Sequence, residues 1–201
     1  MATVKIGRPR SEKSREAIIN ATHALLNEKG GTGLTIEAIA RRAEVGKPTI
    51  YRWWPTLADI VLEVLLRLAD ATIVVPSFGT LRETLRPFLR QSMKAIVDGG
   101  GTHLRFLMAR AQMDEEFRER FRDNFTAKRR AVLRSIFLQA VERGQIGSER
   151  NLEMLLDIVF GAMWYRLLIS HASMDESFAD ELTEVIIGLV QAGSEKQGLA
   201  G

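Results

Sequence analysis

The sequence contains no cysteine, and this absence excludes several kinds of chemistry at once. Disulfide bonds, thiol nucleophiles and thiolate metal sites all depend on the cysteine side chain, and a chain without disulfides suits a reducing compartment. The three histidines, His23, His103 and His171, have no partner in a helical Glu-x-x-His or His-x-x-x-His pattern. We therefore predict that the protein holds no metal ion and needs no cofactor.

Long hydrophobic runs and catalytic motifs are also missing. The longest apolar stretch, Met154 to Ile169, is too short to span a bilayer and contains Asp157 and Arg166. The first residues include no apolar segment of the signal-peptide type, so we expect a cytoplasmic protein without a membrane partner. No serine lies in a Gly-x-Ser-x-Gly motif, and the acidic run 114–116 is better explained as a helix start than as paired catalytic acids. We expect that the protein is not an enzyme.

Basic residues gather in the first quarter of the chain. Residues 1–54 hold ten Lys and Arg against five Asp and Glu, whereas residues 55–201 hold eighteen against twenty. This asymmetry indicates a polyanion as the partner of the first segment, although charge alone leaves open that the basic residues only keep it soluble. Arg8 and Arg10 lie in a stretch without apolar periodicity, and such a basic arm either reaches phosphates and a minor groove or is a solvated tail.

Residues 35–59 form the most informative stretch. A row of small apolar residues marks one helix face: Ile36, Ile39, Ala40 and Ala43. Thr35 before them has the side chain that an N-cap needs. Residues 44–46 predict a turn, in which Gly46 is the residue able to adopt unusual dihedral angles. Residues 47–54 predict a second short helix, with Pro48 in its first turn. Two short helices joined by such a turn, the second polar, basic and aromatic outward, indicate a helix-turn-helix.

This stretch resembles the DNA-binding signature of the TetR family of bacterial transcriptional regulators. The usual run of that family is T-(x)4-I-A-(x)2-A-G-V-S-K-G-T-L-Y-(x)-Y-F-P-S-K-(x)2-L. The matching positions are Thr35, Ile39, Ala40, Ala43, Val45, Lys47, Thr49, Ile50, Tyr51, Trp53, Trp54, Pro55, Thr56 and Ile60. The chain departs from the run at Glu44, Gly46, Pro48 and Leu57, where the family favours Gly, Ser, Gly and Lys.

The resemblance implies double-stranded DNA as a partner and assigns roles to individual residues. Contacts to the DNA backbone position the helix-turn-helix, here called the reader, on the DNA. The resemblance assigns these contacts to Thr35, Lys47, Tyr51 and Trp53. Base edges would be read by Pro48, Thr49 and Arg52, through a methyl contact to thymine and an Arg contact to guanine. We expect Trp54 to pack inside the domain instead.

The rest of the chain predicts helices, and the fold class is therefore all-α. We predict an N-terminal three-helix helix-turn-helix head, residues 1–55, and a C-terminal helical body for ligand binding and dimerisation, residues 56–201. Ser11 is a plausible N-cap for the first helix, and two pairs have the spacing of a capping box: Thr56 with Asp59, and Thr80 with Glu83. We also expect a joint at residues 99–101 and one long helix over residues 114–143.

The last two predicted helices carry more apolar surface than one core face needs. Residues 152–170 are apolar almost all round, and residues 176–191 follow with a further apolar row. This excess predicts a homodimer in which each subunit contributes two helices to a four-helix bundle. A large monomeric core is the alternative.

The resemblance further implies a small-molecule effector that binds in the helical body and releases DNA. We select Phe106, Arg110, Met163 and Trp164 as candidate pocket residues, with ordinary core packing as the alternative for each. The expected function is a ligand-responsive dimeric transcriptional regulator, a repressor released from a palindromic operator, with an activator also open. A helical protein-interaction module that has lost DNA binding is the alternative from another class.

Overall fold

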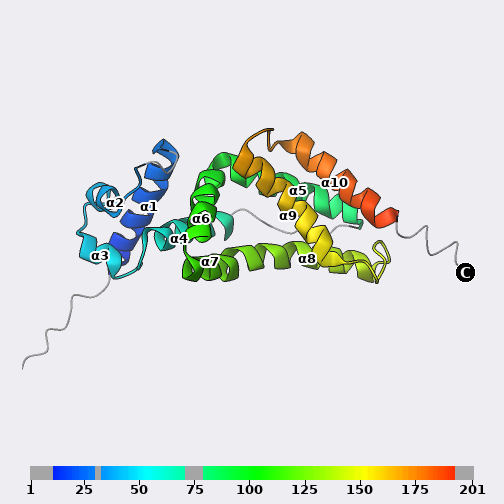
Figure 1. Cartoon of the computed structure of the whole chain (residues 1–201), viewed down its shortest axis with the longest axis horizontal. Helices are drawn as coiled ribbons and strands as arrows, with labels where there is room; N and C mark the ends of the chain where they lie inside the picture. Colours follow the sequence, from blue (N-terminus) through cyan, green and yellow to red (C-terminus); the bar gives the residue numbers. More distant parts are fainter. Residues whose placement is uncertain (1–10, 30–32, 71–78, 193–201) are drawn as a thin grey trace, which may run out of the picture. The chain divides into compact units, whose positions relative to one another are not determined.

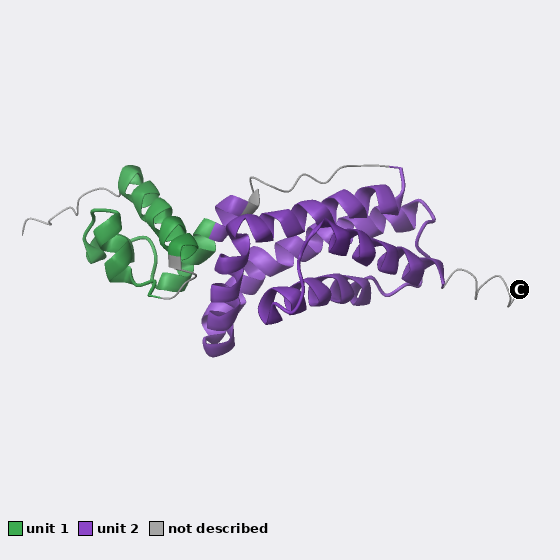
Figure 2. Ribbon diagram, turned by 90° about the horizontal axis from the view of Figure 1, so that it is seen from above, with its two compact units in different colours: residues 1–64 green, residues 65–201 purple. Residues whose placement is uncertain are grey.

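The computed structural model of the chain describes residues 11–29, 33–70 and 79–192. All regular structure in these residues is helical, so the all-α prediction is confirmed. The chain divides into two compact units, Met1–Val64 and Leu65–Gly201 (Figure 2). This division falls inside a helix, whereas the sequence prediction placed the domain boundary between residues 55 and 56. None of the described helices combines the length and apolar character needed to cross a bilayer.

Unit 1 contains three helices and the first part of a fourth (Figure 1). Their bounds are α1 (Glu12–Lys29), α2 (Ile36–Arg42), α3 (Lys47–Tyr51) and α4 (Leu57–Asp70). The predicted caps are present: the Ala38 amide donates to Thr35 Oγ1 at 3.1 Å, and the Asp59 amide donates to Thr56 Oγ1 at 3.2 Å. Each such bond satisfies a backbone N–H that has no partner within the helix.

The core of unit 1 is apolar and receives a side chain from every helix. Its largest fully buried side chains are Ile18, Leu26, Ile39, Ile50 and Ile60. Complete burial of a side chain of this size stabilises the fold by roughly 1.5–3 kcal/mol. Trp54 is only 4% exposed, so the expectation that it packs inside this unit is confirmed. The short helix α3 is therefore held in place from its inner side, by Ile50 and the neighbouring Trp54.

The turn between α2 and α3 differs from the prediction. Gly46 was expected to carry the unusual backbone angles, but it is extended, with φ −76° and ψ 147°. Glu44 instead takes the left-handed conformation, with φ 55°. A residue with a Cβ atom pays roughly 1–2 kcal/mol for this conformation. The turn needs the left-handed residue at the position where the TetR signature has Gly, and this chain places a glutamate there.

Unit 2 contains the remaining helices of the described chain. They are α5 (Leu81–Ala95), α6 (Gly101–Met113), α7 (Glu115–Phe121), α8 (Ala127–Glu142), α9 (Leu152–Ile169) and α10 (Glu176–Gln191). Two five-residue segments join neighbouring helices: the kinked segment η1 (Ile96–Gly100) between α5 and α6, and the π-helical turn η2 (Arg122–Thr126) between α7 and α8. The chain kinks at Gly99, whose φ of 131° favours glycine, near the predicted joint. The predicted long helix over residues 114–143 is interrupted by η2.

The core of unit 2 lies between α5, α8, α9 and α10. Its most deeply buried side chains include Leu85, Leu89, Leu133, Phe137, Val159 and Ile186. Helices α5 and α10 run side by side (Figure 1) and are bridged at the surface by arginine–carboxylate pairs. The Arg82 guanidinium nitrogen Nη2 lies 2.8 Å from Glu184 Oε2, and Arg90 Nη2 lies 2.5 Å from Asp180 Oδ2. Exposed pairs of this kind contribute only about 0–1 kcal/mol each, so the apolar core determines how these helices pack.

Candidate functional site

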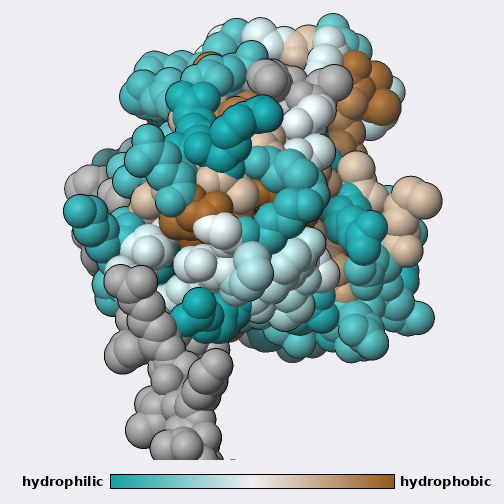
Figure 3. Space-filling view, turned by 90° about the vertical axis from the view of Figure 1, so that its left-hand side faces the viewer, coloured by the Kyte–Doolittle hydropathy of each residue, from teal (hydrophilic) through white to brown (hydrophobic). Residues whose placement is uncertain are grey.

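Helix α3 turns polar and basic side chains toward solvent. Lys47, Pro48, Tyr51 and Arg52 are exposed, whereas Thr49 is half-buried. The helix is five residues long, and Ile50 is its buried residue. The face drawn in Figure 3 is mainly hydrophilic, and hydrophobic residues gather there only in small areas. The residues predicted to contact DNA therefore occupy the accessible side of a firmly anchored short helix, as a reader of base edges requires.

Glu37 connects the beginning of α2 with the beginning of α3. The Lys47 ammonium nitrogen lies 2.5 Å from a Glu37 carboxylate oxygen. This hydrogen bond lowers the pKa of Glu37, and a hydrogen bond with Thr35 contributes to the same effect. The same bond raises the pKa of Lys47. Thr35 and Lys47, both predicted to contact the DNA backbone, thus both interact with Glu37. A DNA phosphate would compete with the Glu37 carboxylate for the Lys47 ammonium group.

A charged pair inside unit 1 holds the two tryptophans that follow α3. The Arg15 guanidinium of α1 pairs with Glu63 of α4. The second Glu63 oxygen accepts a hydrogen bond from the Trp54 indole nitrogen at 2.6 Å. The Arg15 guanidinium carbon also lies 5.1 Å from the centre of the Trp53 ring, within cation–π range. Trp53 and Trp54 are therefore attached to both α1 and α4 through one carboxylate and one guanidinium.

The sequence of unit 1 contains four further arginines that bear on DNA binding. Arg8 and Arg10 lie outside the described residues, so their predicted role stays a prediction. Arg41, at the end of α2, is exposed and makes no ion pair within the described part of the chain, whereas Arg42 binds Glu28 through two contacts of 2.7 Å. Arg41 is not among the residues predicted from the sequence to contact DNA. The consecutive Arg41 and Arg42 in the last turn of a helix were the available signal.

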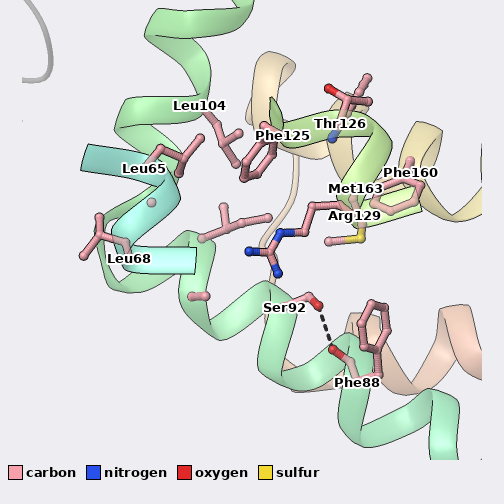
Figure 4. A pocket seen from close by; sticks show the side chains of 14 residues that line it. Leu65, Leu68, Phe88, Ser92, Leu104, Phe125, Thr126, Arg129, Phe160 and Met163 are labelled. Carbon is pink, nitrogen blue, oxygen red and sulfur yellow. Dashed lines mark hydrogen bonds between the residues drawn. The ribbon is translucent and has the colours of Figure 1, made fainter. Parts of the chain in front are cut away.

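Unit 2 encloses a cavity whose wall is almost entirely apolar (Figure 4). Its volume is about 80 Å³, measured as the space open to the centre of a water-sized sphere. The lining residues come from seven elements: Leu65 and Leu68 of α4; Phe88, Ser92 and Ala95 of α5; Ile96 and Gly100 of η1; Leu104 of α6; Phe125 and Thr126 of η2; Arg129 of α8; and Phe160, Met163 and Trp164 of α9. A concave, mainly apolar site with a few polar groups is the usual form of a small-molecule site.

The structure brings together only two of the four residues predicted to bind a ligand. Met163 and Trp164 line the cavity, but Phe106 and Arg110 do not. Arg110 is exposed and pairs with Asp114 at 2.8 Å, and Phe106 is half-buried elsewhere on α6. Helix α6 faces the cavity with Leu104, and the helical period turns residues 106 and 110 to other directions. The set of residues that line the cavity is corrected accordingly, and Arg129 is the charged one among those that the structure describes.

The outer faces of α9 and α10 carry large apolar side chains that the single chain leaves exposed. Between 40% and 59% of the surface of each of these residues is accessible: Met154, Tyr165, Leu168, Ile169, Val185 and Leu189. Gly161 of α9 and Gly188 of α10 both face open space. Apolar side chains interrupted by glycines allow another helix to approach closely. Exposed apolar faces of this extent mark interaction surfaces.

An anchored short helix with an exposed polar face in one unit and an apolar cavity in a second, helical unit define the class of helix-turn-helix transcriptional regulators. Residues 18–64 match the model of bacterial regulatory proteins of the tetR family. Residues 75–186 match the model of the tetracyclin repressor-like C-terminal domain. The chain belongs to the TetR family of transcriptional regulators, and it is not an enzyme.

Individual relatives agree with this membership. The chain is 30% identical to the uncharacterized HTH-type transcriptional regulator YdeS of Bacillus subtilis (strain 168), over 97% of this chain and 98% of YdeS. It is 25% identical to the HTH-type transcriptional regulator AqdR of Rhodococcus erythropolis, over 83% of this chain and 79% of AqdR. Among solved structures, the TetR family regulator SCO0332 has a TM-score of 0.72 at 30% identity, covering 88% of this chain and 97% of that one.

A more distant neighbour shares the fold alone. The transcriptional regulator FadR from Bacillus subtilis, solved in complex with stearoyl-CoA, superposes with a TM-score of 0.67 at 15% identity. The match covers 86% of this chain and 97% of FadR. This arrangement of helices therefore occurs in a protein that binds a small molecule.

Proposed function

We propose that the protein is a dimeric repressor that leaves a palindromic operator when a small molecule enters the cavity of unit 2. The observation that carries this proposal is the helix α4. Its residue Glu63 holds Arg15 and Trp54, and its residues Leu65 and Leu68 line the cavity. A ligand that displaces the two leucines acts on the same continuous helix that anchors the reader. Coupling between two sites requires such an element, whose position both sites bias.

In the proposed complex, α3 enters the major groove of operator DNA. Pro48, Thr49 and Arg52 contact base edges. Contacts to the DNA backbone come from Thr35, Lys47, Tyr51 and Trp53, with Arg8 and Arg10 added from the N-terminal arm. The exposure of most of these side chains supports the assignment. Since bacterial DNA lies in the cytoplasm, we propose that the protein acts there.

The proposed dimer forms through α9 and α10, two helices from each subunit. The exposed apolar residues of these helices, together with Gly161 and Gly188, supply a self-complementary surface. A twofold axis through this surface gives two readers of opposite orientation. The DNA site must then consist of two inverted half-sites, spaced by about one helical turn or a multiple of it.

Binding-site selection from random duplex DNA tests the DNA-binding part of the proposal. Purified full-length protein at near-physiological salt should enrich an inverted repeat. The affinity for that site should fall steeply with salt concentration, because the basic reader displaces condensed counterions. A folded protein that enriches no sequence in the absence of any added small molecule contradicts the proposal and favours a helical protein-interaction module.

The oligomeric state of one variant and its control, measured by analytical sedimentation, tests the proposed interface. Val185→Arg places a charge on the exposed face of α10, and we expect it to produce monomers with much weaker operator binding. Val97→Arg is the matched control, because Val97 is also exposed but belongs to η1. A monomeric wild type, or a dimer that survives Val185→Arg and dissociates with Val97→Arg, removes α9 and α10 from the proposal.

A further inference from the structure

We infer that Glu37 helps to determine the operator sequence, because its carboxylate accepts a hydrogen bond from the N4 amino group of a cytosine in the major groove. The inference rests on the proposed function in one respect, namely that α3 enters the major groove of operator DNA. It adds a base-reading position on α2, and it names the base that this position selects.

Glu37 lies where the first helix of the motif meets the beginning of the second. It is the second residue of α2 and follows the N-cap Thr35 by two positions. Its carboxylate oxygen lies 2.5 Å from the ammonium nitrogen of Lys47, which is the first residue of α3. In helix-turn-helix proteins the N-terminal residues of the second helix contact base edges, while the first helix crosses the DNA backbone. The Glu37 carboxylate therefore lies at the end of α3 that contacts the bases.

The Glu37 side chain points to α3 and not along its own helix. Arg41 lies four residues further along α2, at a spacing that allows a glutamate and an arginine to pair. The described part of the chain shows no ion pair between these two residues, and Glu37 contacts Lys47 instead. The Glu37 side chain is 61% exposed, so a base edge can reach its carboxylate.

A carboxylate at this place needs a hydrogen-bond donor on the DNA. Phosphate groups repel it, and so do the acceptor atoms that guanine and thymine present in the major groove. The groove offers donors at cytosine N4 and at adenine N6, and the adenine amino group stands beside the acceptor N7. Cytosine is therefore the base that best matches a glutamate side chain.

Lys47 prepares the carboxylate for this contact. Its hydrogen bond is the main cause that lowers the pKa of Glu37, and an ionised carboxylate is an acceptor only. Both side chains are at least half exposed, so their ion pair is weak and can exchange partners. When a phosphate binds the ammonium group, the carboxylate becomes available to the cytosine. Sequences without a donor at this place leave the carboxylate unpaired, and this penalty adds to the specificity.

Stabilisation of α2 is the other role open to Glu37. An acidic side chain in the first turn of a helix interacts favourably with the helix dipole, and the contact with Lys47 holds the beginning of α3. Loss of this role alone would weaken binding to all DNA sequences alike. A change of the preferred base at one operator position is the effect that distinguishes base reading from stabilisation.

The base preferences of the full-length protein test the inference. The probe is the operator that the wild type enriches from random duplex DNA, and competition with its single-base variants gives the preference at each position. The wild type should prefer cytosine at one position of each half-site by at least about fivefold. Glu37→Ala should reduce this preference to less than about twofold. Glu37→Gln should move it to adenine, because glutamine can form two hydrogen bonds with adenine N6 and N7.

An operator analogue tests the hydrogen bond itself. Replacement of the selected cytosine by 2-pyrimidinone removes the N4 amino group. The wild type should bind the analogue at least about fivefold more weakly than the unmodified operator. Glu37→Ala should lose less than about twofold, and this comparison excludes a general effect of the weakened base pair. The selected position should differ from the one that Arg52→Ala relaxes, since Arg52 lies at the opposite end of α3.

Glu44→Gln is the matched control. Glu44 is also an exposed acid of unit 1, but it belongs to the turn and makes no ion pair within the described residues. Its replacement should change no base preference. Unchanged base preferences in a folded Glu37→Gln variant overturn the inference, as does equal weakening of its binding to all sequences. An equal loss of affinity for the analogue by the wild type and Glu37→Ala has the same consequence.

The selection experiment separates this inference from the proposed function. An enriched inverted repeat whose base preferences are independent of the side chain at position 37 overturns the inference alone, and the DNA-binding part of the proposed function stands. A folded protein that enriches no sequence overturns both.

Discussion

The two units of the molecule differ in how their functional residues are distributed along the chain. The candidate reader in unit 1 draws its described residues from positions 35–53, on two short helices and their flanks. The cavity in unit 2 draws on positions 65–164 and on seven separate elements. A linear motif can therefore identify the reader, whereas the chemistry of the cavity becomes visible only after folding.

The units also differ in where they place charge. Unit 1 exposes basic side chains around α3, and its charged pair of Arg15 with Glu63 contacts the two tryptophans. Unit 2 exposes a series of ion pairs along α5 and α10 and turns one arginine toward an apolar cavity. The first arrangement suits a polyanion with repeated charge.

The largest effect that separates the units is expected from Trp54→Ala. The change removes a buried indole and its hydrogen bond to Glu63, and unit 1 should lose about 3–5 kcal/mol of unfolding free energy. Operator binding should be lost, whereas the helices of unit 2 should stay folded. Urea denaturation followed by circular dichroism measures the stability, and a titration with operator DNA measures the affinity. Retained operator affinity would contradict the structural role of Trp54.

Glu63→Gln should produce the next largest effect. The Glu63 side chain is 21% exposed and contacts both Arg15 and Trp54. Loss of its negative charge should therefore destabilise unit 1 by roughly 1.5–3 kcal/mol. Glu184→Gln is the matched change in unit 2, where the paired side chains are about half exposed, and should cost less than about 1 kcal/mol. Thermal unfolding of the two variants checks the difference. Equal destabilisation would mean that the Glu63 contacts in unit 1 stabilise the fold no more than the exposed ion pairs of Glu184 in unit 2.

Arg52→Ala should change sequence preference more than stability. Arg52 is exposed at the C-terminal end of α3, and its loss should relax preference at one position of each half-site by roughly 1–3 kcal/mol. Competition binding with single-base operator variants measures this effect. Lys47→Ala is the comparison, because loss of a phosphate contact should weaken all operator sequences alike. Unchanged base preference would remove Arg52 from the set of base-reading residues.

The smallest effect is expected from Glu44→Gly. Glycine adopts the left-handed conformation of the turn without the steric cost, at the expense of greater freedom in the unfolded chain. Unit 1 should gain about 0.5–1 kcal/mol, without a change in operator sequence. Glu44→Ala controls for the loss of charge and should not stabilise. A destabilised Glu44→Gly protein would show that the glutamate side chain itself supports the turn.

The sequence predicted features that depend on residues close together in the chain. The caps at Thr35 and Thr56, the burial of Trp54 and the extent of the last two helices belong to this group. It misplaced the left-handed residue because glycine is the usual choice for such angles and Gly46 stood two positions away. Segment η2 was missed because Phe117, Phe121 and Phe125 continue the apolar spacing of an α-helix through it.

The cavity was predicted only in part, for a physical reason. An arginine on an amphipathic helix usually reaches solvent, and the spacing of α8 does not distinguish Arg129 from the exposed bases around it. Its direction depends on the π turn that precedes it and on the aromatic ring of Phe125. Arg110 resembled a pocket residue by composition, but its side chain pairs with Asp114.

The continuity of α4 has a consequence for the construction of hybrid regulators, in which the reader of one protein is joined to the sensor of another. A junction between residues 55 and 56 would leave Glu63 with the foreign body and deprive Arg15 and Trp54 of their partner. A junction after Val64 keeps these three residues together and requires only that the helical register continue across the seam. In this chain, sensors are best exchanged inside a helix and not at the loop that precedes it.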